Sequence, residues 1–278
     1  MLSDLPLIYY VQIFNYLFPT TTVGAFLTLF FFLVVVLVGA KRLKLNFPAA
    51  ALMALLVFIL SNVISRVIFI LSRIYLHHDF ESQGRVFYLF TNQKVSIGFL
   101  LAIILAVPIG RYVYDLKKGV GKYFDLIMLA YLSIFFSRLG GALVRYHPGR
   151  ITDSNWGTFY LGHYRHEPSL YEAVSLLLIF ALSILVVKRI KTEGLLGFII
   201  LAWVSFSRII TDFFRSNDLL SSHLSKTNGF LASNYHLENG LTLNQIFHTL
   251  LFLGAVFGMF ILIKKTKYQK KKSLKKLN

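Results

Sequence analysis

Six ionisable side chains stand inside or at the edge of strongly apolar stretches of this 278-residue chain. They are Arg66, Arg138, Glu172, Arg208, Asp212 and Arg215. A charged side chain at bilayer depth costs at least ~2.5–3.5 kcal/mol, so it normally faces a polar cavity or a partner and indicates a functional site. Four arginines against two carboxylates predict that an anion from outside the chain completes the charge balance. Because the planar guanidinium group suits phosphate, these residues predict a site for a phospholipid headgroup.

The spacing of three of these residues places them together. Arg208, Asp212 and Arg215 follow an i, i+4, i+7 pattern and therefore lie on one face of a helix. Glu172 opens another apolar stretch, directly after Tyr171. For Arg66 and Arg215 a second interpretation stays open, in which side chains near helix ends extend to the outer membrane interface.

The elements that must position these residues are apolar helices. Seven stretches approach the length needed to cross a hydrocarbon core of ~30 Å, which takes about 20 helical residues. They cover residues 22–40, 47–70, 95–110, 124–144, 169–187, 194–214 and 241–263, of which the third is short. With 56% hydrophobic and 15% charged residues, the composition predicts an all-α integral membrane protein with about seven transmembrane helices.

We expect residues 1–263 to form a single seven-helix transmembrane domain and residues 264–278 to form a basic cytoplasmic tail. No basic segment precedes the first apolar stretch and no small-residue cleavage pattern follows it, so we expect this stretch to be retained.

The formal net charge of +17 comes from basic clusters in alternate connections between the apolar stretches. By the positive-inside rule, these connections and the C-terminus are cytoplasmic and the N-terminus is outside. This explanation is favoured over a nucleic-acid surface, because the basic residues do not follow one soluble face. The tail is interpreted as a topology signal in preference to a specific lipid site. The outward loop 215–240 is longer than the topology needs, and both a lid and a plain connector remain open for it.

Residue types exclude several classes of chemistry. The chain has no cysteine, so it offers neither a disulfide nor a nucleophilic thiolate of its own. His163 and His166 are three residues apart in a loop without an obvious third ligand, and no metal site and no cofactor are expected. Neither a nucleophile elbow nor a P-loop or dinucleotide fingerprint is present.

Several local patterns, in the same order along the chain, resemble the prolipoprotein diacylglyceryl transferase family. RHEPSLYEA at 165–173 is similar to the Arg-His-Pro-x-Gln-Leu-Tyr-Glu segment that opens a span in that family. The segment 194–218 is similar to a Gly-rich start followed by Phe-Arg-x-x-x-Glu-Phe-Phe-Arg. LTLNQIF at 241–247 resembles Leu-Ser-Met-Gly-Gln, and SRLGGALVRYHPGR at 137–150 falls on the family signature Gly-Arg-x-Gly-Asn-Phe-x-Asn-x-Glu-x-x-Gly.

The chain also departs from the family pattern. Arg138, Gly140 and Gly149 match the signature, whereas its asparagine and glutamate positions are not kept. VSIGFL at 95–100 has no histidine where the family carries His-Gly-Gly. Two alternatives therefore stand beside the transferase: a catalytically impaired or repurposed phospholipid-binding protein on the same scaffold, and a transferase with a changed donor or acceptor.

The resemblance implies a multi-pass enzyme of the bacterial cell membrane whose partners are a phosphatidylglycerol-like phospholipid and the signal peptide of a prolipoprotein. In this family a diacylglyceryl group moves from phosphatidylglycerol to the lipobox cysteine. The residues then expected to be catalytic are Arg138, Arg208, Glu172 and Tyr171. Those expected to bind substrate are Arg66, Asp212, Arg215, Gly140, Gly149, His166 and Gln245.

In this scheme the acceptor thiol attacks glycerol C3 and glycerol phosphate leaves. Arg138 and Arg208 would stabilise the leaving phosphate, while Asp212 and Glu172 orient the guanidinium groups. The base remains open among His163, His166, Tyr171 and another group.

Overall fold

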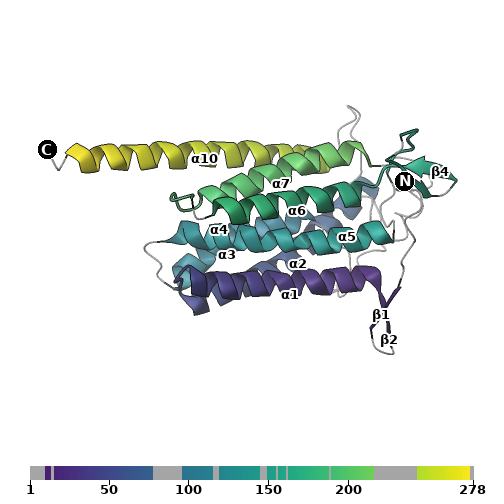
Figure 1. The fold of residues 1–278 in the computed structure, drawn as a ribbon, viewed down its shortest axis with the longest axis horizontal. Helices are drawn as coiled ribbons and strands as arrows, with labels where there is room; N and C mark the ends of the chain where they lie inside the picture. The colour runs from purple at the N-terminus through teal and green to yellow at the C-terminus, as the bar shows by residue number, and fades with distance from the viewer. Residues whose placement is uncertain are drawn as a thin grey trace.

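The helices of the protein run side by side in one bundle (Figure 1). The computed structural model describes residues 10–13, 16–77, 96–114, 119–144, 149–154, 156–160, 162–187, 189–215 and 243–275. Its helices are α1 (Thr20–Arg42), α2 (Phe47–His77), α3 (Ser96–Val113), α4 (Val120–Tyr131), α5 (Phe135–Leu143), α6 (Pro168–Val186), α7 (Leu195–Phe213) and α10 (Leu243–Lys275), with a 3₁₀ turn η2 (Leu132–Ile134).

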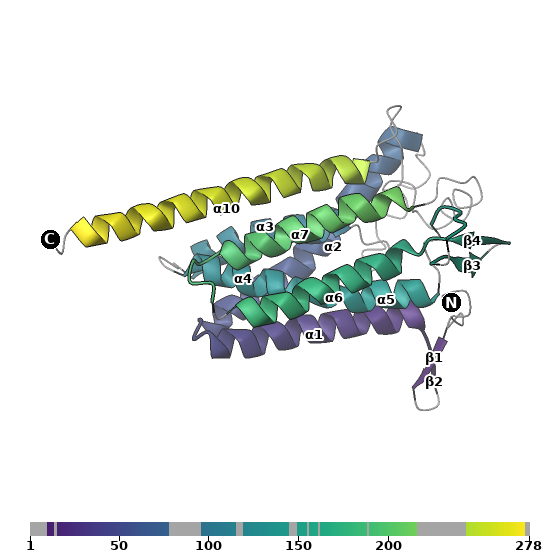
Figure 2. The ribbon, with the colours of Figure 1, turned by 45° about the horizontal axis from the view of Figure 1, so that its top comes forward.

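Two antiparallel hairpins lie at the same end of the bundle (Figure 2). One pairs β1 (Tyr10–Ile13) with β2 (Tyr16–Pro19), and the other pairs β3 (Thr158–Tyr160) with β4 (His163–Arg165). The second hairpin directly precedes α6, and so it stands beside the first turn of that helix. The predicted loop 215–240 falls, apart from Arg215, outside the described residues.

The described residues contain six helical units that are long and apolar enough to cross a membrane, and α3 adds a shorter apolar helix. The six are α1, the first part of α2, the combined α4–η2–α5, α6, α7 and α10. The predicted all-α, multi-pass membrane architecture is therefore confirmed. Which end faces outward stays a prediction.

Three helices differ in detail from the predicted spans. Helix α2 continues past residue 70, the end of the predicted stretch, to His77. The stretch 124–144 is not one continuous α-helix, because η2 divides it into α4 and α5. At the other end of the chain, α10 continues past residue 263 to Lys275, so no break separates the last span from the basic tail.

Among the six candidate spans in the described part of the chain, α7 is the most enclosed. In its most apolar 18-residue stretch 56% of the residues are buried, against 11% for α10. Its start is anchored to α4 by Asp125, whose carboxylate accepts hydrogen bonds from the backbone N–H groups of Gly194 at 2.8 Å and Gly197 at 2.6 Å. Gly194 has a φ of +84°, a conformation that glycine adopts without strain. An enclosed helix is a suitable carrier for charges that must be kept from lipid.

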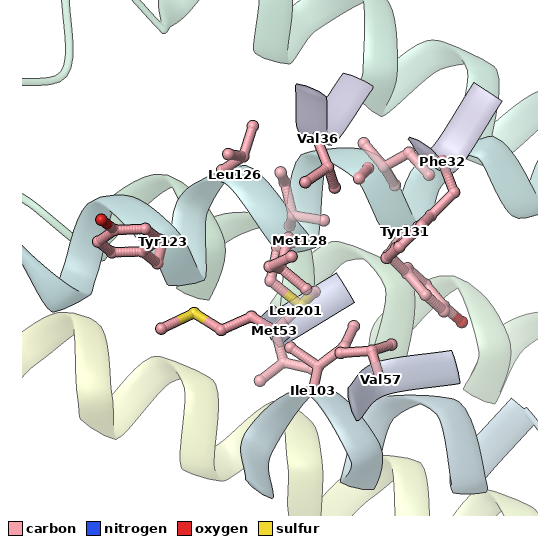
Figure 3. Close-up of a cluster of buried hydrophobic side chains, with 14 of the residues drawn as sticks. Phe32, Val36, Met53, Val57, Ile103, Tyr123, Leu126, Met128, Tyr131 and Leu201 are labelled. Carbon is pink, nitrogen blue, oxygen red and sulfur yellow. The ribbon is translucent and has the colours of Figure 1, made fainter. Parts of the chain in front are cut away.

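The apolar core fills the middle of the bundle between α1, α2, α3, α4 and α7 (Figure 3). Ten of its side chains are labelled there: Phe32, Val36, Met53, Val57, Ile103, Tyr123, Leu126, Met128, Tyr131 and Leu201. The outward faces are apolar as well, with Phe26 67% exposed and Leu250 64% exposed. Exposed apolar surface of this extent fits a helix bundle whose solvent is lipid.

Candidate functional site

Glu172 is the centre of a buried charged cluster at the end of the bundle that carries the hairpins. It lies in the first turns of α6, and only 5% of its surface is exposed. One carboxylate oxygen, Oε1, accepts hydrogen bonds from Arg208 and, at 2.9 Å, from Arg215. The other oxygen, Oε2, lies 3.0 Å from Nε of Arg138. Three guanidinium groups from different parts of the chain therefore meet at one carboxylate.

Asp212 supplies the second carboxylate of this cluster. Its Oδ1 lies 2.8 Å from Nε of Arg215 and 3.7 Å from Nε of Arg208. Arg208 and Asp212 share one face of α7 as predicted, whereas Arg215 lies just beyond the end of that helix. Its Oδ2 accepts a hydrogen bond from the side-chain amide of Asn244 at the start of α10. Asp212 therefore holds the end of α7 against the start of α10.

Arg215 is fixed by backbone hydrogen bonds just beyond α7. Gly149 forms a β-bridge with Arg215 and donates a hydrogen bond to the carbonyl oxygen of His166 at 2.9 Å. The neighbouring Arg150 donates from its backbone N–H to Phe214 at 2.8 Å and from Nε to the Arg215 carbonyl at 3.1 Å. A Cβ atom at Gly149 would lie 2.5 Å from the His166 oxygen, so only glycine fits this contact.

The charge state of Arg215 follows from its surroundings. Burial lowers the pKa of its guanidinium group, but the carboxylates of Asp212 and Glu172 outweigh that effect and raise the pKa above its ordinary value. With its side chain 3% exposed and paired to both acids, Arg215 does not extend to the membrane interface. The interpretation in which Arg215 extends to the outer membrane interface is therefore wrong.

Arg138 is positioned by the break between α4 and α5. Because the turn η2 interrupts the α-helical hydrogen bonding, the backbone N–H of Ser137 instead donates to the hydroxyl of Thr28 on α1, at 3.1 Å. Ser133 in the turn donates to the Thr28 carbonyl oxygen at 3.0 Å. These bonds set the start of α5 against α1 and direct Arg138 to Glu172. Its side chain is 18% exposed and is the most accessible guanidinium group of the cluster.

Gly140 contributes to the site through helix packing. It lies against α1, where an added Cβ atom would be 3.0 Å from the Thr20 carbonyl oxygen. Gly24 faces it from α1, and its added Cβ atom would be 2.8 Å from the Phe136 carbonyl oxygen. The two glycines let α1 and α5 approach closely, which supports the helix that carries Arg138. Gly140 itself makes no contact with the charged cluster in the described structure.

Tyr171 points away from the charged cluster. Its hydroxyl lies 3.1 Å from Nδ1 of His166, and both rings pack against Phe214. Tyr171 and Glu172 are adjacent in a helix, so their side chains leave it about 100° apart. Burial lowers the pKa of His166 below its ordinary value, which favours the neutral ring.

A groove between α6 and α7 connects this aromatic group with the cluster. It has a volume of about 490 Å³, and its walls include Tyr171, His166, Trp203, Phe206, Thr211 and Phe214. Within it, Trp203 of α7 donates its indole N–H to the hydroxyl of Ser175 on α6 at 3.0 Å. Thr211 is its polar link to the charges, since the Thr211 hydroxyl lies 3.4 Å from Oε1 of Glu172. The groove is therefore mainly aromatic and apolar, with ionic groups behind one wall.

Two further residues, Gln245 and Arg66, were predicted to bind substrate. Gln245 is 3% exposed on α10, with its side-chain amide 3.5 Å from the Ile209 carbonyl oxygen. It therefore borders the cluster through the α7 backbone. Arg66 belongs to α2, and its side chain lies outside the described part of the structure.

Three residues at the site were not predicted from the sequence: Thr211, Asn244 and His248. All three are buried. Asn244 and His248 share a signal that could have found them, since two polar residues four positions apart in an apolar stretch lie on one helix face.

Within the described ranges, no three side chains of the His, Cys, Asp or Glu types gather where they could hold a metal ion. Among the described side chains of the cluster, three guanidinium groups face two carboxylates. Guanidinium groups gathered in this way can bind an anion. Buried charges of this kind require a partner, and the planar donors of arginine suit phosphate oxygens.

Comparison with known proteins gives one consistent result. The family model described as prolipoprotein diacylglyceryl transferase matches residues 14–262. The chain is similar to the phosphatidylglycerol–prolipoprotein diacylglyceryl transferase of Campylobacter curvus, 30% identical over 170 residues, which are 60% of this chain and 56% of the relative. The enzyme of that name from Campylobacter lari is 30% identical over 168 residues, 60% of this chain and 55% of the relative. That from Wolinella succinogenes is 29% identical over 133 residues, 46% of each chain. The aligned part of the chain thus spans about half the length of these curated relatives.

Proposed function

Because the chain belongs to the prolipoprotein diacylglyceryl transferase family, we propose that it moves a diacylglyceryl group from phosphatidylglycerol to the lipobox cysteine of a prolipoprotein. It is a multi-pass protein of the bacterial inner membrane.

The observation that carries the proposal is the meeting of Arg138, Arg208 and Arg215 at Glu172. The carboxylate holds the three guanidinium groups at fixed positions before any substrate arrives. Preorganised positive groups in a site of low polarity stabilise a developing negative charge more strongly than water does. Arg138 is the accessible member, and its described ion pair uses Nε, which leaves its terminal nitrogens as donors for a phosphate.

The reaction places a new negative charge on phosphate. The sulfur of the acceptor cysteine attacks C3 of the diacylglycerol moiety, and an S–C bond forms as the C–O bond to phosphate breaks. The electron pair of that bond remains on the leaving glycerol phosphate. Arg138 and Arg208 offset the added charge, while Glu172 and Asp212 keep the guanidinium groups oriented.

The groove between α6 and α7 supports the lipid part of the proposal. Its aromatic walls suit the glycerol backbone and the upper acyl chains, and Thr211 brings the groove to the charged cluster. A lipid lying there would place its phosphate at the polar end and its chains toward the bilayer.

The direct test uses the purified protein in phosphatidylglycerol nanodiscs with a synthetic lipobox peptide. We expect a diacylglyceryl-modified peptide in the mass spectrum, and no product from the same peptide with serine in place of cysteine. Arg208→Ala should bind less phosphatidylglycerol and form no product.

A phospholipid-binding protein without transfer activity is the second candidate, favoured by the unmatched asparagine and glutamate positions of the family signature. The same assay distinguishes this candidate from the transferase. Phosphatidylglycerol would bind in an Arg138-dependent manner while the cysteine peptide remained unmodified.

A further inference from the structure

His248 is a buried histidine whose ring nitrogens have no hydrogen-bond partner among the described residues. Its side chain lies on α10, and the residue is 1% exposed. Both Nδ1 and Nε2 are enclosed and unpaired within that part of the chain. Buried polar groups in native proteins are nearly always hydrogen-bonded, so a buried ring with two unused nitrogens points to a ligand or water that reaches it.

The helix geometry places His248 at the depth of Arg208. Asn244 and Asp212 are joined by a hydrogen bond, and α7 and α10 run antiparallel (Figure 1). His248 lies four residues after Asn244, and Arg208 lies four residues before Asp212. Each step is about 6 Å along its helix, and both residues stay on the faces that meet.

The charged groups around His248 are those of the cluster. The ring interacts electrostatically with Arg208 of α7, Glu172 of α6 and Arg138 of α5, and with Arg215 beyond α7. It therefore borders the proposed phosphate site from the side of α10, whereas the aromatic groove lies between α6 and α7.

The two acids of the site are already engaged. Both oxygens of Glu172 pair with arginines, and Asp212 pairs with Arg215 and Asn244. Three histidines have described side chains: His163, His166 and His248. His163 is exposed on β4, and His166 lies 3.1 Å from the Tyr171 hydroxyl in the aromatic groove. Of the three, His248 is the one with unengaged nitrogens beside the arginines.

We propose that His248 is the general base that takes the proton of the acceptor thiol, an inference that rests on the proposed transfer reaction. The S–H proton passes to a ring nitrogen of His248 as sulfur bonds to C3 and the C–O bond to phosphate breaks. The imidazolium ion then returns the proton to the released phosphate monoester. Protons and charges balance, and no further reactant is needed.

The test separates proton removal from phosphate binding by changing the acceptor atom. His248→Gln is assayed in phosphatidylglycerol nanodiscs with a lipobox peptide that carries cysteine, and again with the same peptide carrying selenocysteine. A selenol is far more acidic than a thiol and is already ionised at neutral pH, so it needs no base. With cysteine we expect a loss of about 10²–10⁴-fold, the usual contribution of a general base. With selenocysteine the variant should approach the rate of the unsubstituted protein.

Controls keep the result interpretable. Thr249→Ala changes the next residue of α10, which is exposed, and should leave both rates unchanged. Arg208→Ala should lose activity with both peptides, since its defect concerns phosphate. Melting curves in detergent report whether His248→Gln is folded. If that variant is unstable, His248→Asn and rescue of His248→Ala by added imidazole provide the same comparison.

The outcomes are distinct. Recovery with selenocysteine supports the proposal. An unchanged rate for His248→Gln, or an equal defect with both peptides, would overturn it while leaving the transferase function in place. An unsubstituted protein that modifies neither peptide would instead contradict the proposed function, and the role of His248 would fall with it.

Discussion

Arg215 Nη2 lies 2.9 Å from Oε1 of Glu172, and this contact joins the end of α7 to the beginning of α6. The same carboxylate also holds Arg208 and Arg138. A single acid therefore orients three basic groups from separate elements, and its removal should affect folding and chemistry together.

Glu172→Gln removes the negative charge while keeping the shape of the side chain. Loss of one partner from a buried ion pair costs about 3–5 kcal/mol, because the remaining charges are left without compensation. We expect a clear fall in melting temperature in detergent and no detectable transfer. Glu193→Gln is the matched control, since the exposed pair of Glu193 with Lys122 contributes at most about 1 kcal/mol. Equal stability of the two variants would contradict the role given to Glu172.

Arg208→Lys and Arg138→Lys keep the positive charge and lose the planar donor group. A site that requires oriented guanidinium donors should then lose about 10²–10³-fold in turnover, the usual effect of removing one preorganised donor. Phosphatidylglycerol binding should change less than turnover. Arg189→Lys, at an exposed position away from the cluster, should have no effect. Full activity of both cluster variants would show that charge alone is sufficient.

Gly140→Ala and Gly141→Ala form a pair that tests the packing of α5. A Cβ atom at Gly140 would be 3.0 Å from the Thr20 carbonyl oxygen, whereas at Gly141 its nearest atom is the Ser169 hydroxyl at 3.8 Å. We expect Gly140→Ala to separate α1 from α5, displace Arg138 and lower both melting temperature and transfer. Gly141→Ala should be tolerated. If Gly141→Ala were harmful and Gly140→Ala were tolerated, the close contact between α1 and α5 at Gly140 would be contradicted.

His166 should make the stability of the protein depend on pH. Because burial lowers the pKa of its ring below the ordinary 6.5, the unfolded chain binds the proton first as the pH falls. The free energy of unfolding therefore decreases as the pH falls through 6.5 toward the folded-state pKa. We expect the melting temperature to drop more in the unsubstituted protein than in His166→Gln when the pH is lowered from about 7.5 to about 5.5. His163→Gln, at an exposed position, should behave like the unsubstituted protein, and an equal drop in all three would contradict the role of His166.

Much of the fold could be predicted from the sequence because membrane spans depend on local composition. A run of apolar residues of sufficient length determines a span, whatever its neighbours are. The bounds of α6 and α7 accordingly differ from the prediction by about one residue. The turn η2 was not predicted, since it depends on hydrogen bonds with Thr28, more than a hundred residues earlier in the chain.

The site was predictable only where charge made a residue conspicuous. Arg138, Glu172, Arg208, Asp212 and Arg215 stood out because ions are costly in an apolar stretch, and the structure brings all five together. The orientation of Tyr171 toward His166 depends on the position of β4 and could not be read from the chain.

Three residues of the site carry no fixed charge: Asn244, Thr211 and His248. Within apolar stretches they therefore did not stand out from other polar residues. Their significance comes from the partners that other helices provide. Asn244 contacts Asp212, and Thr211 contacts Glu172.

The most direct measurement is complementation in bacteria depleted of their own diacylglyceryl transferase, with mass spectrometry of a reporter lipoprotein. The account predicts that expression of this chain restores the diacylglyceryl-modified reporter and that Arg208→Ala, inserted at the same level, does not. Accumulation of the unmodified precursor despite normal insertion of the unsubstituted protein would contradict the transferase function.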